Sequence, residues 1–287
     1  MAIWTIVRLT LKEAGRRRLL HAAVFLTIVM VGFTGWGFSR LPTLSCGGHP
    51  CPEAEIRVTA AVLLILIAYM FNFILAIGAA FIAAPAIASD VESGLFLAML
   101  PRPIRRSEVV LGKWLALVIL VAGYAALTCL LEFLVVYLVL DFIPPHPVQA
   151  ALFLAAQSVV LLTFALLAST RLSPMTGGVV AVVLFGLAWM GGIAEQIGMT
   201  FSNVALTNVG TVMSLLLPTD GLWRGAIYSL EPVAVLALAG TTRASSGSGN
   251  PFFFVAGPPP TPYLIWAVLW VVVMLRLTVV SFNQRDL

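Results

Sequence analysis

The sequence contains few charged residues, and this scarcity excludes an ordinary soluble domain. Of its 287 residues only 10% are charged and 61% are hydrophobic, whereas a soluble domain carries roughly a quarter charged residues. The composition therefore indicates a membrane protein. Catalytic motifs are also missing: neither G-x-S-x-G nor H-E-x-x-H occurs, and the three histidines, His21, His49 and His146, are scattered along the chain.

A phosphate-binding loop is absent as well. Such a loop requires G-x-x-x-x-G-K-[ST], but the glycine–lysine pair Gly112–Lys113 is followed by Trp114, and position 107 is serine where the first glycine should stand. The chain is therefore not expected to hydrolyse ATP or to bind a cofactor. Its net charge of +4 comes without a basic patch interleaved with aromatic residues, so no nucleic acid is expected as a partner.

Long apolar segments dominate what remains. A membrane-crossing helix needs about 20 mostly apolar residues, and six segments reach that length: 19–38, 58–86, 110–140, 148–169, 175–195 and 262–281. Crossing segments must satisfy their own backbone hydrogen bonds, which favours helices. The sequence predicts an all-α polytopic membrane protein with six transmembrane helices, forming a single domain over residues 1–287.

Lysine and arginine near the helix ends indicate the orientation of the chain. With a cytoplasmic N-terminus, the inner segments hold twelve basic residues: Arg8, Lys12, Arg16, Arg17, Arg18, Arg102, Arg105, Arg106, Lys113, Arg171, Arg276 and Arg285. The outer segments hold four: Arg40, Arg57, Arg224 and Arg243. Both termini are therefore predicted to be cytoplasmic.

The first 18 residues have the pattern of an amphipathic helix. One helical face carries Ile3, Ile6, Val7, Thr10, Leu11 and Ala14, while Arg8, Lys12 and Arg16 lie elsewhere. This spacing predicts an interfacial helix over residues 1–18. An ordinary positively charged flank, which needs no apolar face, is the alternative.

The first outer loop holds two of the three cysteines. Cys46 and Cys51 flank the turn-forming sequence GGHP on the oxidising side of the membrane, where disulfides persist. A disulfide between them is predicted. A metal site of Cys46, His49 and Cys51, or two free thiols, are the alternatives. Cys129 falls in the third crossing and is interpreted as a packing residue.

A long outer region, residues 196–261, separates the fifth and sixth crossings. Its apolar stretch 204–217 is too short to span, so a re-entrant or interfacial segment is expected. A helix capped by Thr219 or Asp220 should follow. Its apolar side would carry Leu222, Trp223, Ala226, Ile227 and Leu230. Glu195, just before this region, is expected to end the fifth crossing in the outer headgroups.

Residues 89–106, between the second and third crossings, interrupt the apolar pattern with charges and prolines. Ser89 is suited to cap a helix, with Glu92 completing a capping box, and Pro101 and Pro103 prevent the helix from continuing. Apolar residues fill the stretch 95–100 of this helix. A capped apolar helix outside the membrane indicates docking on a partner, and a plain solvated loop is the alternative.

The same segment resembles a known family. Glu92, Gly94, Leu100, Arg102, Pro103, Arg106, Gly112 and Lys113 match the pattern after the second crossing of type-2 ATP-binding cassette (ABC) exporter permeases. The terminal Arg285–Asp286 is also similar to that family's closing pair. The resemblance covers the whole chain, and is strongest to permeases of copper-enzyme maturation and of drug or peptide export.

The resemblance implies a coupling helix in residues 89–106 that docks on a separate ATPase subunit. The implied contact residues are Asp90, Glu92, Gly94, Arg102, Pro103, Arg105 and Arg106. It also implies two ATPase copies, which would bind ATP and Mg, and a second copy of the permease or a homologue of it. The complex would lie in the inner (cell) membrane of a bacterium or archaeon. The alternative function is an ATP-driven scaffold that acts mechanically on an extracytoplasmic protein through residues 196–261.

Polar residues inside the crossings are candidates for a translocation path, because such groups are costly unless they face protein or water. Tyr69, Asn72 and Glu132 are the predicted members. Glu132 falls about 28 Å along its helix from Lys113, so a hydrated position at the outer surface is the alternative. For Asn72, packing against another helix is the alternative.

Overall fold

The computed structural model of the chain describes residues 2–15, 18–43, 45–46, 49–92, 94, 105–231, 255 and 257–284. Its helices are α1 (Ala2–Ala14), α2 (Arg18–Arg40), α3 (Glu53–Ala83), α4 (Pro85–Glu92), α6 (Arg106–Leu140), α7 (Pro147–Ala168), α8 (Pro174–Thr200), α9 (Val204–Leu216), α10 (Asp220–Leu230) and α12 (Thr261–Asn283). A 3-10 turn, η1 (Leu41–Thr43), and a hairpin of strands β1 (Ser45–Cys46) and β2 (His49–Pro50) join α2 to α3. The fold is all-α, as predicted, apart from this short hairpin.

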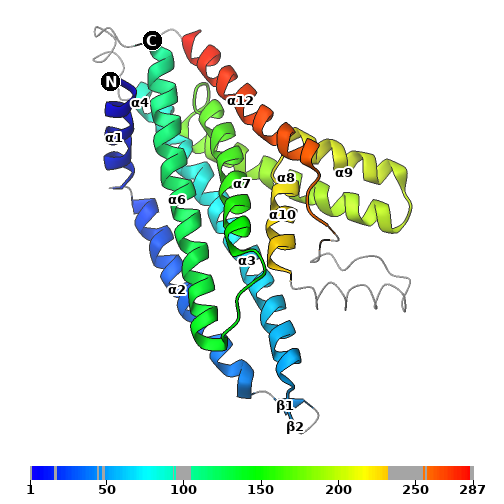
Figure 1. Cartoon of the computed structure of the whole chain (residues 1–287). Helices are drawn as coiled ribbons and strands as arrows, with labels where there is room; N and C mark the ends of the chain where they lie inside the picture. The colour runs from blue at the N-terminus through cyan, green and yellow to red at the C-terminus, as the bar shows by residue number, and fades with distance from the viewer. Residues whose placement is uncertain are drawn as a thin grey trace.

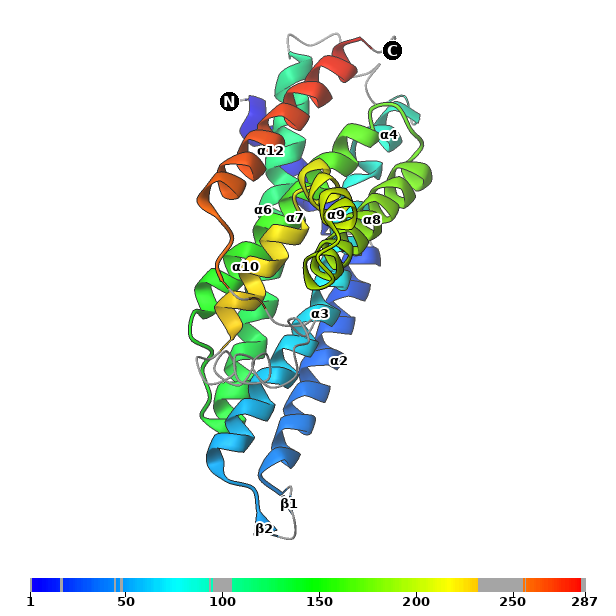
Figure 2. The ribbon, with the colours of Figure 1, turned by 90° about the vertical axis from the view of Figure 1, so that its right-hand side faces the viewer.

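The long helices run side by side between two distinct ends (Figure 1). At one end lie α1, α4, the start of α6 and the last turn of α12; at the other lies the β1–β2 hairpin. We call these the terminal end and the hairpin end. A view from the side shows that α10 and the start of α12 lie between the two ends, against α7 (Figure 2).

In the described part of the chain, six helical stretches are long and apolar enough to cross a membrane. They are Leu20–Thr43, Glu55–Glu92, Arg106–Leu140, Pro147–Ala168, Pro174–Thr200 and Thr261–Asn283. Each overlaps one predicted crossing, so the predicted number and order of crossings are confirmed. The second stretch includes α4, because α3 passes directly into α4 at Ala84 and Pro85, a residue that suits the first turn of a helix.

Helix α7 forms the centre of the bundle. It contacts α3, α6, α8, α10 and α12, and 61% of its most apolar stretch is buried, against 17% in α2 and in α12. An interior helix can bury polar groups only if they find partners. Thr163 of α7 accepts a hydrogen bond from the Trp114 indole N–H of α6 at 2.9 Å. The outer faces of α2 and α12 are left for lipid or for another chain.

Helices α8 and α9 form a tightly packed antiparallel pair that leans away from the bundle (Figures 1 and 2). A Cβ atom added to Gly210 of α9 would lie 2.5 Å from the carbonyl oxygen of Gly191, and one added to Gly198 would lie 2.5 Å from the backbone nitrogen of Thr207. Backbones this close leave no room for a methyl group. The glycines therefore determine how α9 folds back on α8.

Aromatic side chains of α12 cover the end of α9. The indole N–H groups of Trp266 and Trp270 donate to the carbonyl oxygens of Leu215 and Leu216 at 3.0 and 2.9 Å. Since the last four carbonyls of a helix have no partner within it, these bonds satisfy groups that would be costly in an apolar surrounding. They hold α9 and α12 together at this point.

The short helix α10 packs as predicted. Its expected apolar side is buried in full, and consists of Leu222, Trp223, Ala226, Ile227 and Leu230. Thr219 is the residue before the first turn, but its side chain makes no capping bond to α10. The apolar segment 204–217 also forms a helix too short to span, α9.

Helix α1 packs one face against α6, with Val7, Thr10 and Ala14 buried. Trp4, Arg8 and Lys12 are exposed on the rest of its surface, which agrees with an amphipathic helix. Its position at a membrane interface stays a prediction, since no bilayer is present. Arg16 and Arg17 of the predicted segment lie outside the described residues.

Two local predictions are wrong. Ser89 does not begin a helix: it lies inside α4, where its hydroxyl donates to the Pro85 carbonyl one turn earlier, because Pro85 already provides the helix start. Glu195 does not end the fifth crossing, since α8 continues to Thr200. Its carboxylate is instead held by α9 and α10, as described below.

Candidate functional site

The residues around segment 89–106 meet at the terminal end. Asp90 of α4 is buried and forms an ion pair with Lys113 of α6, whose ammonium group also donates to the Ala86 carbonyl. The side chains of Lys113 and Asp90 are only 7% and 11% exposed. A buried pair whose members make further hydrogen bonds has its desolvation cost offset. It attaches the helix that leads into the segment to the helix that follows it.

Glu92 and Gly94 lie just beyond this ion pair. Glu92, the last residue of α4, is exposed. Gly94 has a φ of 69°, and its N–H donates to the Val91 carbonyl at 3.1 Å. This left-handed conformation is costly for any residue with a Cβ atom, so a glycine is required where the chain turns out of α4. Residues 95–104, including the predicted Arg102 and Pro103, lie outside the described residues.

The two arginines at the start of α6 have different surroundings. Arg105 is exposed, and its backbone N–H donates to the Glu108 carboxylate at 3.3 Å. The Arg106 guanidinium turns away to donate to the carbonyls of Phe282 and Asn283, at 3.4 and 3.2 Å. A cation suits the C-terminal carbonyls of a helix. Arg106 therefore joins α6 to the last turn of α12.

Gly112 connects the same part of α6 to α1. A Cβ atom at this position would lie 2.8 Å from a methyl group of Ile6, so only glycine lets α1 approach this closely. Through Gly112, Lys113 and Arg106, the first turns of α6 thus contact α1, α4 and α12 respectively. Movement of the segment between α4 and α6 would act directly on all three helices.

The predicted path residues do not form one cluster. Asn72 of α3 is 2% exposed, and its carbonyl oxygen accepts from the Gln157 amide of α7 at 2.6 Å. The Asn72 amide nitrogen and the Gln157 carbonyl oxygen have no partner. Tyr69 packs edge-on against Trp223 of α10, with ring centroids 4.5 Å apart. Both residues bind neighbouring helices of the same chain, and a role in transport stays a prediction.

Glu132 is buried between α6 and α2. It is 3% exposed, and its Oε1 atom accepts a hydrogen bond from the Thr34 hydroxyl at 3.3 Å, while Oε2 has no partner. Within this chain it is therefore not a hydrated surface carboxylate, which was the alternative to a path-lining position. A single weak bond leaves a buried carboxylate poorly compensated.

The two cysteines of the predicted disulfide lie between α2 and α3, and the pairing of Cys46 with Cys51 stays a prediction. Cys51 is disulfide-bonded, and Cys129 is a free, buried cysteine. The side chains of Cys46 and His49 lie outside the described residues, although the β1–β2 ladder pairs the backbones of these two residues. No cluster of three metal-binding side chains occurs in the described part of the chain.

Sequence reasoning missed a charged cluster where α8, α9 and α10 meet. Arg224 forms ion pairs with Glu195 and Asp220, each at 2.7 Å, and the Thr211 hydroxyl donates to Glu195 at 2.8 Å. Burial raises the pKa of Asp220 to about 6, against the opposing effect of the Arg224 charge. The i, i+4 spacing of Asp220 and Arg224 was a usable signal, whereas their approach to Glu195 depends on the return of the chain through α9.

Glu231, directly after α10, is a second buried carboxylate outside the spanning helices. Its Oε1 atom accepts the Val255 backbone N–H at 2.8 Å, and Oε2 has no partner. Burial raises the pKa of Glu231 to about 7, although the bond from Val255 lowers it. This bond joins the two described ends of the long region whose middle, residues 232–254, lies outside the described part.

The architecture defines a polytopic membrane protein whose second and third crossings are bound together beside a polar connecting segment. The chain belongs to the ABC-2 family of transporter proteins, whose family model matches residues 4–287. It is thus a membrane permease subunit of an ABC transporter, a class that associates with an ABC ATPase. The resemblance seen in the sequence is confirmed. A comparison with curated proteins finds no match.

Proposed function

We propose that this permease couples ATP hydrolysis by two separate ATPase subunits to export of a substrate, with residues 89–106 as the contact. The observation that supports the proposal is the attachment of both ends of this segment to the bundle. Asp90 joins its first helix to α6, and Arg106 joins its end to α12. A force applied to the segment would reach the spanning helices rather than bend a loose loop.

The proposal places the terminal end in the cytoplasm of a bacterium or archaeon, with the chain in the cell (inner) membrane and paired with a second permease. Charge supports this orientation. The described basic residues of α1 and of the start of α6 are Arg8, Lys12, Arg105, Arg106 and Lys113, and Arg171 bonds Ser281 near the end of α12. Arg40 and Arg57 lie in the ends of α2 and α3 that flank the hairpin, and Arg224 lies in α10. ATP and Mg would be bound by the ATPase partners.

Charge reversal at an exposed contact residue tests the coupling. Arg105→Glu changes a side chain that is exposed, whereas reversal of Arg106 would also disrupt its bonds to α12. We expect Arg105→Glu to reduce copurification of the coexpressed ATPase and ATP-dependent transport. Arg57→Glu, at the opposite end, is the matched control and should leave both unchanged. Full ATPase copurification with normal turnover in Arg105→Glu would contradict the assignment.

The scaffold function is the second candidate, and it depends on the region 196–261. In that region α10 buries its apolar side in the bundle and α9 packs on α8, while α9 still exposes Val204, Val212 and Leu216. The exposed side of α9 is a described surface that an extracytoplasmic partner would contact. Deletion of residues 241–250 discriminates: a scaffold loses its extracytoplasmic partner, while an exporter keeps transport.

A further inference from the structure

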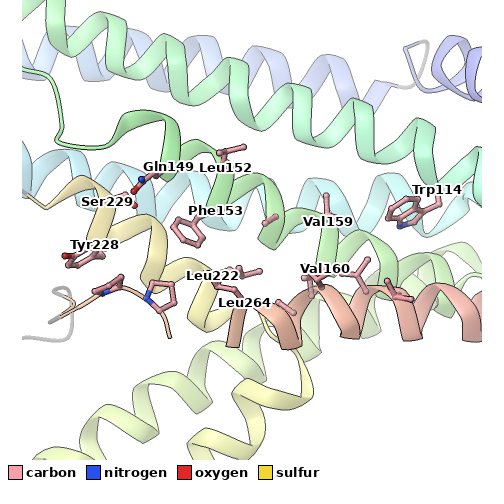
Figure 3. A pocket seen from close by; sticks show the side chains of 17 residues that line it. Trp114, Gln149, Leu152, Phe153, Val159, Val160, Leu222, Tyr228, Ser229 and Leu264 are labelled. Carbon is pink, nitrogen blue, oxygen red and sulfur yellow. The ribbon is translucent and has the colours of Figure 1, made fainter. Parts of the chain in front are cut away.

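A groove between α7, α10 and α12 has an almost wholly apolar lining (Figure 3). It has a volume of about 820 Å³ and is lined by 17 residues. This is within the range of small-molecule sites, roughly 300–1,000 Å³. Its wall follows α7 from Gln149 to Val160, a rise of about 16 Å at 1.5 Å per residue.

Polar groups gather at one end of the groove. Figure 3 shows Gln149, Tyr228 and Ser229 together at that end and Trp114 at the other. Gln149 lies in the first turn of α7, and the lining also includes Pro258 and Pro259, which belong to the proline stretch just before α12. Helix α7 begins at this end, so the polar groups of the lining lie beside its first turn, and the rest of the lining is apolar.

The opposite end is lined by apolar side chains and one tryptophan. Trp114 of α6 lines it, and its indole N–H is already bonded to Thr163. At the polar end, by contrast, the side chains of Gln149 and Tyr228 make no hydrogen bond to the described residues. The Ser229 hydroxyl donates to the Gly225 carbonyl and keeps capacity to accept. Within the described lining, free side-chain donors and acceptors are therefore found at the polar end.

None of the lining residues carries a charge near neutral pH, because the lining contains no Asp, Glu, Lys, Arg or His. The nearby charges of α10 are occupied with one another, since Asp220 and Arg224 pair with each other and with Glu195. A bare carboxylate or phosphate in the groove would thus lose water without gaining a counter-charge. An extended peptide would bury more backbone polar groups than the three polar side chains could satisfy.

We propose that this groove binds a neutral single-chain amphiphile, such as a monoacylglycerol. The hydrocarbon chain lies along α7 and α12 toward Trp114, and the uncharged head bonds to Gln149 and Tyr228 at the membrane surface. The proposal concerns binding within one permease chain. It does not depend on the coupling of residues 89–106 to an ATPase, and the test below is performed without ATP.

Photolabelling of the full permease–ATPase complex tests the site. The complex is reconstituted in phosphatidylcholine vesicles that contain a monoacylglycerol with a diazirine near the end of its chain, and labelled peptides are quantified by mass spectrometry. We expect label to concentrate on groove residues near Trp114, such as Val160 and Val271. A fatty acid with the same diazirine, charged at pH 8, should label these residues less.

Two variants and one control complete the experiment. Ala156→Trp fills the groove and should reduce labelling about tenfold, the change that a loss of 1.4 kcal/mol in binding gives. Gln149→Leu combined with Tyr228→Phe removes only the head contacts and should reduce it without affecting the fold. Val183→Trp, on the exposed face of α8, should leave labelling unchanged.

Several outcomes would overturn the proposal. One is label spread evenly over the exposed faces of α2, α8 and α12, which would indicate ordinary bulk lipid. Another is equal labelling by the fatty acid. A third is undiminished labelling in both groove variants. A fourth is loss of labelling when two permease chains are cross-linked to each other, which would show that the groove is covered by the second permease in a dimer.

Discussion

Removal of the Lys113 ammonium group should destabilise the permease far more than removal of an exposed lysine. Lys113→Met keeps the length of the side chain but leaves the Asp90 carboxylate without its cation in a site where Asp90 is 11% exposed. Breaking a buried ion pair from one side typically costs about 3–5 kcal/mol. At 2–4 °C per kcal/mol, a loss of about 3 kcal/mol lowers the unfolding temperature by roughly 6–12 °C.

The measurement is thermal unfolding of the purified permease in detergent, followed by tryptophan fluorescence. Lys12→Met is the matched control, because Lys12 is exposed on α1, and it should shift the unfolding temperature little. Asp90→Leu combined with Lys113→Met replaces both charges by apolar groups and should recover most of the loss. ATPase copurification can be measured on the same preparations.

Two results would refute this reasoning. If Lys113→Met shifts the unfolding temperature no more than Lys12→Met, the ion pair does not stabilise the contact between α4 and α6. If the losses of the single Asp90 and Lys113 variants add up in the double variant, the two side chains do not interact energetically. Either result would also remove the main support for force transmission through α4.

Two further predictions concern α9 and the residue that follows α10. Burial raises the pKa of Glu231 from 4.5 to about 7, so the stability that its neutral carboxyl group gives the folded state is fully present below about pH 4.5 and is lost as the pH rises through 7. Glu231→Gln stays neutral at every pH. This variant should therefore be more stable than the parent by up to about 3 kcal/mol at pH 8 and equally stable at pH 4.5. An unfolding temperature that is unchanged at pH 8 would contradict this. Gly210→Ala should lower the unfolding temperature, because its Cβ atom would lie 2.5 Å from the Gly191 carbonyl oxygen. Gly186→Ala is the control and should be neutral or stabilising, because its Cβ atom would have no neighbour within 4 Å. Equal shifts of the unfolding temperature in the two variants would show that α8 and α9 are not closely packed.

Properties that depend on neighbours in the sequence could be predicted well. The six crossings follow from runs of apolar residues, and the buried side of α10 follows from its helical spacing, including Trp223 and Ile227. The start of α4 was predicted wrongly at Ser89, because two helix-start signals lie four residues apart and Pro85 comes first in the chain. Local signals of this kind compete, and sequence order alone does not decide between them.

Contacts between distant residues could not be predicted. Asp90 was interpreted as a contact for the ATPase, yet within the chain it pairs with Lys113, 23 positions away. The same holds for Glu195 and Arg224, which meet only because α9 folds back on α8. Each of these side chains had several possible partners in the sequence, and no spacing rule connects residues on different helices.

The amino-acid sequence by itself determined that this chain has six membrane-crossing helices. The reason is that each residue has its own free-energy cost of entering hydrocarbon, which depends on its side-chain charge and on its backbone hydrogen bonds and not on distant residues. It also provided the polar segment and the family pattern around Gly94 and Arg106. Only the tertiary structure decided which charges neutralise one another, how the first turns of α6 join α1, α4 and α12, and where a groove remains open between α7 and α12. Those features depend on distances between helices, and helix packing in a membrane is determined by the combined shape of many side chains.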